Sequence, residues 1–111
     1  MLRYAYNSNG LQNHRLEDAV TLVAEAGYDG IALTLDIQHL DPAKPSLAKR
    51  AYVLRGHLED AGLGCVVETG ARFLLDPRHK HEPTLVSPTH QERERRLDFL
   101  KQAIEVAQRL V

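Results

Sequence analysis

Short apolar runs alternate along the chain with longer stretches in which apolar and polar residues follow a helical period. The short runs predict β-strands near residues 2–7, 30–36 and 64–69. The middle run, GIALTLD, is apolar almost throughout, as strands covered on both faces are. We therefore expect it to lie at the centre of a sheet.

The longer stretches, near residues 15–26, 46–61 and 90–110, have apolar positions three and four apart and predict three helices. Their ends carry further signals: Gly27 and Gly62 suit the residue just past a helix, and Ser46 suits an N-cap. Thr89 with Glu92 matches a capping box. The residues predicted to face inward are Leu16, Ala19, Val20, Val23 and Ala24, then Leu47, Ala51, Leu54, Leu58 and Ala61, then Leu97, Leu100, Ile104 and Ala107.

The predicted order is β-α-β-α-β-α, which implies right-handed crossovers and a parallel sheet. The pairs Ala26-Gly27 and Ala61-Gly62 recur 35 residues apart, about one βα unit. Three βα units in 111 residues give a length per unit close to that of an eight-stranded barrel, which has eight units in ~250 residues. The fold class expected for residues 1–111 is therefore α/β, as the N-terminal part of a (β/α)8 TIM barrel. A complete three-layer minidomain is the alternative.

Composition narrows the function classes. A formal net charge of −1 supplies no basic field for nucleic acid or an anionic membrane, and no apolar run reaches the ~20 residues of a membrane span. The single cysteine, Cys65, lies in an apolar strand and is expected to be a small buried hydrophobe rather than a nucleophile. Together with an N-terminus that lacks a signal-peptide core, it predicts a cytoplasmic protein.

Polar residues follow each predicted strand, at the end where α/β proteins bind ligands. Such amides, carboxylates, imidazole and guanidinium suit a polyhydroxylated or phosphorylated small molecule. The residues after the strands are Asn7 and Asn9, Asp36 and His39, and Glu68, Thr69 and Arg72. Of these we predict substrate contacts for Asn7, His39, Glu68 and Arg72, with Glu68 the best candidate for a catalytic role.

Each of these residues also has a structural interpretation. Glu68 could cap loop amides or pair with Arg72, Asp36 could form a turn, and His39 could be a solvated loop histidine. Asn7 and Asn9 are common turn residues. The charged run RHKHEP is expected to be solvated, although so long a proline-rich loop is also typical of a binding segment. The run ERERR is expected on the wet face of the last helix.

Three stretches carry a family likeness: YNSNG, GYDGIALTLDIQHLDP, and GLGCVVETGARFLLDP with the following KHEP. They resemble the N-terminal portion of the sugar phosphate isomerase/epimerase family, which belongs to the xylose isomerase-like TIM barrels. The likeness spans the whole chain but about three of the eight βα units.

The resemblance implies proton transfer through an enediolate of a sugar or sugar phosphate. It also implies a divalent metal (Mn, Mg, Co or Zn) in the full barrel, held by two glutamates, an aspartate and a histidine from later strands. No metal is expected to bind tightly to these 111 residues alone.

Two alternatives remain at this point. In an endonuclease IV-like phosphodiesterase His39 would be a metal ligand, and a truncated barrel would have no activity of its own. The bare edges of a three-stranded sheet would also allow these 111 residues to self-associate.

Overall fold

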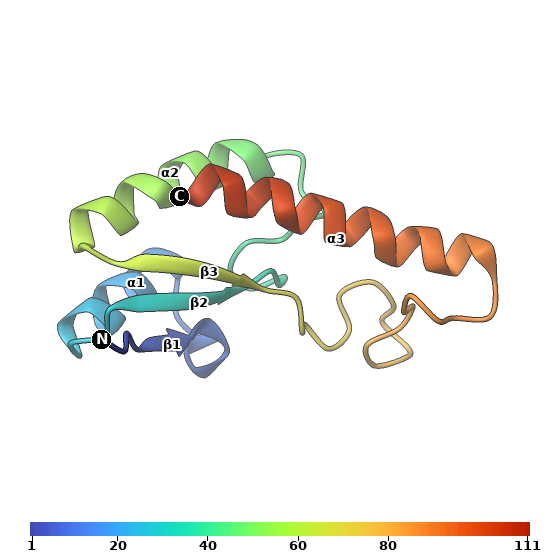
Figure 1. Ribbon diagram of the computed structural model, residues 1–111, viewed down its shortest axis with the longest axis horizontal. Coiled ribbons are helices and arrows are strands. Elements are labelled where there is room, and N and C mark those ends of the chain that lie inside the picture. Colours follow the sequence, from blue (N-terminus) through green and yellow to red (C-terminus); the bar gives the residue numbers. More distant parts are fainter.

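Three short strands lie side by side in chain order, β1-β2-β3, and all run parallel. The computed structural model describes residues 1–111 (Figure 1). The strands are β1 (Ala5–Asn7), β2 (Gly30–Thr34) and β3 (Gly64–Glu68). The helices are the short 3-10 helix η1 (Ser8–Leu11), then α1 (Leu16–Glu25), α2 (Leu47–Ala61) and α3 (His90–Leu110). The predicted α/β order and the parallel sheet are confirmed.

The two faces of the sheet differ. The register aligns Ile31 with Cys65 and Leu33 with Val67, and these side chains belong to the core or pack against it. We call this the helix-covered face. The alternate residues make the open face, where Ala5 is exposed and Val66 is 59% exposed. Strand β2 is buried along most of its length, as its apolar sequence predicted.

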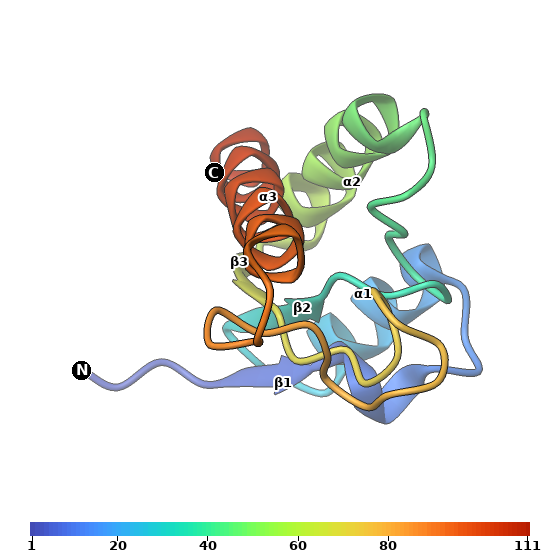
Figure 2. The ribbon, with the colours of Figure 1, turned by 90° about the vertical axis from the view of Figure 1, so that its right-hand side faces the viewer.

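The helices contact one another in series, α1 with α2 and α2 with α3. In the view of Figure 2, turned by 90° from Figure 1, the helices gather on one side of the sheet. A single core of leucine, isoleucine, valine, alanine and phenylalanine side chains fills the space between them and the sheet. Because the strand order does not reverse and the helices lie on one side, the two β-α-β crossovers wind in the same sense.

Most predicted helix ends are confirmed. Gly27 and Gly62 have φ of 90° and 70°, a region in which residues with a Cβ are strained. The Thr89 hydroxyl accepts the amide of Glu92 at 3.2 Å and donates to its carboxylate. Ser46 holds the N-cap position of α2 as predicted, although its side chain makes no capping hydrogen bond.

The inward stripes of α1 and α2 are those predicted, but the stripe of α3 is only partly so: of its predicted residues, Leu100 packs against the core. Leu97 and Ile104 are 36% and 61% exposed, whereas the buried side chains are Phe99, Ala103, Val106 and Leu110. Helix α3 carries two adjacent apolar stripes of the same spacing, and periodicity alone cannot choose between them. Packing against α2 and β3 selects the stripe that contains Phe99.

All three strands are shorter than predicted, β3 by its last residue alone. Strand β1 starts at Ala5, although the Tyr4 amide donates to the Asp29 carboxylate at 2.8 Å. Strand β2 stops at Thr34, because the chain turns at Asp36, whose carbonyl accepts the His39 amide.

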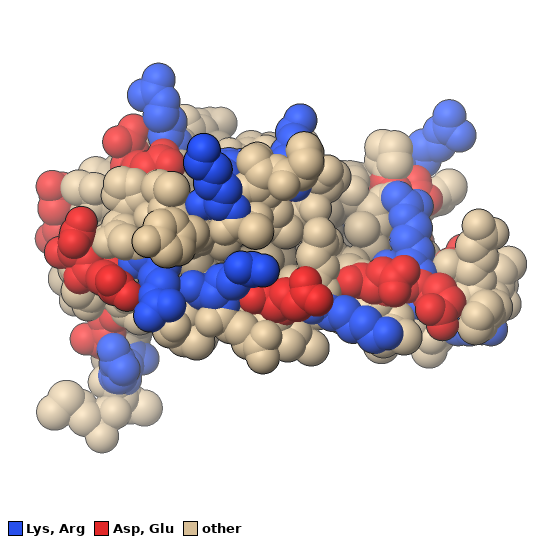
Figure 3. Space-filling view, turned by 90° about the horizontal axis from the view of Figure 1, so that it is seen from above, with Lys and Arg blue, Asp and Glu red and all other residues tan.

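The outer surface of α2 and α3 carries both charge signs. Figure 3 shows basic and acidic side chains interspersed on this face, with neither sign forming a continuous patch. No helix combines the length and apolar character needed to cross a membrane.

Candidate functional site

A cavity of about 350 Å³ opens beyond the carboxyl ends of the strands. It lies between the segment after β1, the turn after β2 and the loop after β3, so three βα connections contribute to it. The lining residues are Asn9, Gln12, Asp36, Ile37, Gln38, Gly70, Ala71, Arg72, Phe73 and Leu74. The structure thus brings the predicted Arg72 together with Asn9 and Asp36 from the same predicted rim.

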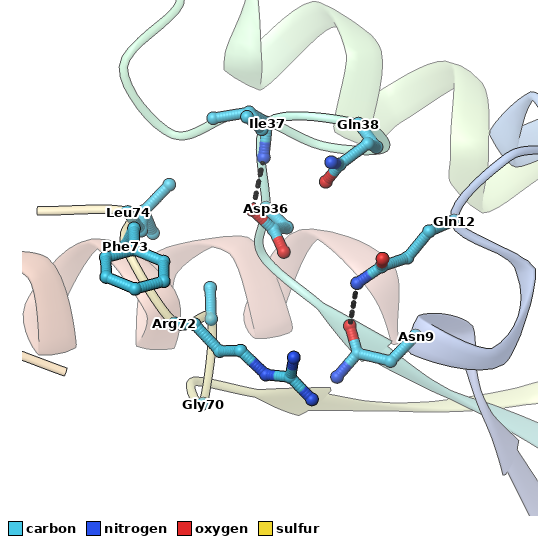
Figure 4. A pocket seen from close by; sticks show the side chains of 10 residues that line it. Asn9, Gln12, Asp36, Ile37, Gln38, Gly70, Arg72, Phe73 and Leu74 are labelled. Carbon is cyan, nitrogen blue, oxygen red and sulfur yellow. Dashed lines mark hydrogen bonds between the residues drawn. The ribbon is translucent and has the colours of Figure 1, made fainter. Parts of the chain in front are cut away.

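Two opposite charges face this cavity without pairing. The three ion pairs of the chain lie elsewhere, at Arg55–Glu59, His79–Asp76 and His90–Glu94. Figure 4 shows the Arg72 guanidinium extending toward the Asn9 amide, with the Asp36 carboxylate turned to the same space. One Asp36 oxygen accepts the Ile37 amide at 2.7 Å, which is the predicted turn role. The Arg72 guanidinium is thus left to donate hydrogen bonds to a ligand, and the Asp36 carboxylate is left to accept them.

Three carboxamides complete the polar lining. The Gln12 amide donates to Asn9 Oδ1 at 3.5 Å, and Gln38 points into the same space (Figure 4). Carboxamides donate and accept, as hydroxyl groups do. Phe73 adds an apolar wall and is 51% exposed. This mixture suits a small polar molecule that carries several hydroxyls.

Glu68 lies beside the cavity rather than in its lining. One carboxylate oxygen accepts the Gly70 amide at 2.6 Å, and the other accepts the Thr34 hydroxyl at 2.5 Å. Glu68 makes no ion pair with Arg72. The contacts match the loop-capping interpretation, so in this arrangement Glu68 supports the segment that carries Arg72.

Asn7 belongs to the same hydrogen-bond network. Its side chain caps η1 by accepting the Asn9 amide at 2.8 Å, and the same oxygen lies 3.2 Å from the Thr34 hydroxyl. The ends of β1, β2 and β3 therefore meet at Thr34, whose hydroxyl lies within hydrogen-bond distance of both Asn7 and Glu68. Two of the four predicted contact residues thus lie under the cavity and one, Arg72, lines it.

The fourth residue, His39, is placed apart from the others. Its side chain is buried at 2% exposure, and Nε2 lies 3.0 Å from the carbonyl oxygens of both Leu11 and His14. The expectation of a solvated loop histidine is therefore wrong. These contacts make the ring a link between the segments after β1 and β2, and nothing in them favours a nuclease-type metal ligand.

The loop of residues 69–89 is held by α3. Arg96 donates to the carbonyls of Pro83 and His81 at 2.8 and 3.0 Å, and Arg93 donates to those of Ser87 and Pro88. Both arginines are half-buried, so the expectation that the ERERR run lies wholly on a wet face is wrong for these two. The His81 amide donates to the carbonyl of Arg72 at 2.6 Å, which joins the clamped loop to the cavity.

Two side chains have shifted pKa values, and neither lines the cavity. Partial burial raises the pKa of the Cys65 thiol from 9.0 to about 11, which keeps it protonated at neutral pH. The side chain packs against the core but is half-buried, so it is less covered than the predicted buried hydrophobe. Within the loop, the backbone amide of Arg78 and then the His79 side chain hold the pKa of Asp76 below its usual value. The charged form of Asp76 is thus the form that orders the 76–79 turn.

The residues of this chain alone do not form a zinc-type metal centre. No group of three histidine, cysteine, aspartate or glutamate side chains converges on one point, whereas zinc sites use three or four protein ligands. No step of a reaction is therefore routed through a metal.

Comparison with models of known protein families, with curated protein sequences and with solved structures gives no significant match to this chain.

Three polar residues of the site were missed by sequence reasoning: Thr34, Gln12 and Gln38. Thr34 had a usable signal, because it is the one polar residue of the run IALTL and shares the parity of Ala32, on the face opposite Leu33. The two glutamines lie in connections whose path the sequence does not specify, and no pattern singled them out.

Proposed function

We propose that this chain is the substrate-binding N-terminal part of a xylose isomerase-like TIM barrel. In this proposal the full barrel is a metal-dependent sugar or sugar-phosphate isomerase or epimerase. Three observations support the barrel: the strand order has no reversal, the helices lie on one side, and both edge strands are unpaired on their outer sides. A closed barrel removes such edges.

The observation that carries the proposed activity is the unpaired Arg72–Asp36 set in one cavity, with amides from Asn9, Gln12 and Gln38. A guanidinium binds a phosphate or carboxylate through two parallel hydrogen bonds. A carboxylate and amides accept and donate to sugar hydroxyls. A ketose phosphate presents both kinds of group at the two ends of one small molecule.

Within this proposal the residues have distinct roles. Arg72 binds the anionic end of the substrate, Asp36 orients a hydroxyl, and Glu68 holds the loop segment that presents Arg72. The metal and the acid–base pair would come from segments that carry the remaining strands, because the residues described do not converge as a metal site.

Titration of the 111-residue chain with a ketose phosphate, the matching neutral ketose and inorganic phosphate tests the binding role. We expect amide shift changes at Asn9, Asp36 and Arg72 in NMR spectra, and tighter binding of the ketose phosphate than of either part. Arg72→Gln should weaken binding of the phosphate about tenfold, the cost of losing one charge-assisted pair. Arg78→Gln, an exposed loop arginine outside the lining, is the matched control.

Equal affinity for the charged and the neutral ketose would contradict the role of Arg72. Shift changes confined to residues outside the cavity would contradict the site itself. If Arg78→Gln had the same effect as Arg72→Gln, the binding would be a non-specific charge effect.

A further inference from the structure

Thr34 occupies the centre of the site although it does not line the cavity. It ends the central strand β2, and its side chain is completely buried. Its amide donates to the Ser8 hydroxyl at 2.9 Å, and its own hydroxyl lies within hydrogen-bond distance of Asn7 and of Glu68. One side chain thus contacts the end of each neighbouring strand.

The hydroxyl of Thr34 has a single proton and two oxygen acceptors. Asn7 Oδ1 already accepts the Asn9 amide at 2.8 Å, whereas the Thr34 hydroxyl is the only donor to Glu68 Oε2. A carboxylate is also the stronger acceptor, because a hydrogen bond to an ionised group is roughly twice as strong as a neutral one. The proton is therefore assigned to the bond with Glu68.

This bond holds the Glu68 carboxylate where its other oxygen can accept a hydrogen bond from the Gly70 amide. The other oxygen, Oε1, lies 2.6 Å from that amide. A Cβ on Gly70 would lie 2.3 Å from the same oxygen, so the carboxylate fills the space that a side chain would need. Gly70 lines the cavity and is two residues before Arg72.

We propose that Thr34 is the positioning residue of the ligand site, acting through Glu68 and Gly70 on the placement of Arg72. The inference deepens the proposed function and rests on it for the ligand. The effect on Gly70 is independent of any ligand. The chain of contacts runs from a rigid central strand to a loop, which is how a site on a loop acquires a fixed geometry.

Thr34→Val removes the hydroxyl and keeps the branched shape, and Thr34→Ser keeps the hydroxyl. The control is Thr69→Val, because Thr69 lies next to Glu68 and its side chain makes no hydrogen bond. In Thr34→Val we expect the Gly70 amide to exchange with solvent about tenfold faster than in the wild type. The Leu33 amide in the β2–β3 ladder should be unchanged. The ketose phosphate should bind about tenfold more weakly, and Thr34→Ser should restore both values.

Gly70→Ala tests the same link from the other end. The added methyl group must displace the carboxylate, so it should weaken ligand binding as Thr34→Val does, while Thr69→Val should leave it at the wild-type value. If Thr34→Val fails to fold, the pair Thr34→Ser and Gly70→Ala still decides the outcome. Wild-type binding by Thr34→Ser together with weakened binding by Gly70→Ala supports the inference. Weakened binding by Thr34→Ser or wild-type binding by Gly70→Ala overturns it.

The two proposals fail in different ways. If the wild type binds no sugar phosphate but Gly70 exchange responds to Thr34→Val, the ligand assignment is wrong and the positioning link stands. If the wild type binds and neither Gly70 exchange nor affinity responds, Thr34 has no positioning role.

Discussion

The helix-covered and open faces of the sheet are built from alternate residues of the same strands, yet they serve different purposes. On the helix-covered face, Leu33 is fully buried, and the side chains around it are apolar. On the open face the same strands end in Asn7, Thr34 and Glu68, where the Thr34 hydroxyl donates to Glu68 and lies 3.2 Å from Asn7 Oδ1. Because side chains alternate with a period of two, one strand can stabilise the fold with one parity and position polar groups with the other.

The largest expected effect is on the helix-covered face. Leu33→Ala should lower the free energy of unfolding by about 3 kcal/mol or more, because it leaves a cavity in a core without free space. Val66→Ala on the open face should change it by about 0.5 kcal/mol or less, since that side chain is largely exposed. Urea unfolding followed by circular dichroism measures both, and equal costs would break the comparison.

On the helix-covered face, the contribution of Cys65 to stability is expected to depend on pH. Its pKa in the folded state is about 11, above the 9.0 of the free thiol, so its stabilising contribution is complete below pH 9 and is lost as the pH rises toward 11. The expected loss is roughly 2–3 kcal/mol. The stability of the wild type relative to Cys65→Ala should fall over this interval. A pH-independent difference would mean that Cys65 is not desolvated by the helices.

A smaller effect is expected where α3 clamps the loop. Arg96→Gln removes the donors to the His81 and Pro83 carbonyls, and should cost about 1–2 kcal/mol. Limited proteolysis should then cut within residues 76–87 faster than in the wild type. Arg95→Gln is the control, because Arg95 is exposed and makes none of these bonds; an equal increase there would contradict the clamp.

The smallest effect on stability is expected at the open edge. We propose that the unpaired outer side of β3 promotes self-association, and Val66→Lys places a charge beside it. Sedimentation velocity should show less association for this variant, with a free energy of unfolding within about 0.5 kcal/mol of the wild type. A wild type that stays monomeric at high concentration would contradict the proposal.

The sequence predicted more of the fold than of the site. Strands and helices were located to within a few residues, because apolar periodicity and the glycines at 27 and 62 are local signals. The site required contacts between segments distant in sequence. His39 shows the limit: its rim position was predicted, but its burial against the carbonyls of Leu11 and His14 depends on the path of another connection.

The correct choice between competing local interpretations also needed tertiary structure. The two apolar stripes of α3 are equal by spacing, and only packing showed that Phe99 faces inward and Ile104 outward. Arg93 and Arg96 read as surface charges until the carbonyls of a loop are brought against them. Every residue has a main-chain carbonyl, so the sequence does not indicate which carbonyls an arginine will bind.

The clamp on the loop acts on main-chain oxygens, and this has a consequence for sequence change. Arg93 and Arg96 contact carbonyls at residues 81, 83, 87 and 88, whereas side chains such as Lys80, Leu85 and Val86 project outward. An engineer could therefore rewrite those outward positions, or mount a label or an epitope on them, while the loop kept its path. Helix α3 would still bind the main-chain carbonyls of the loop, whichever side chains the loop carries.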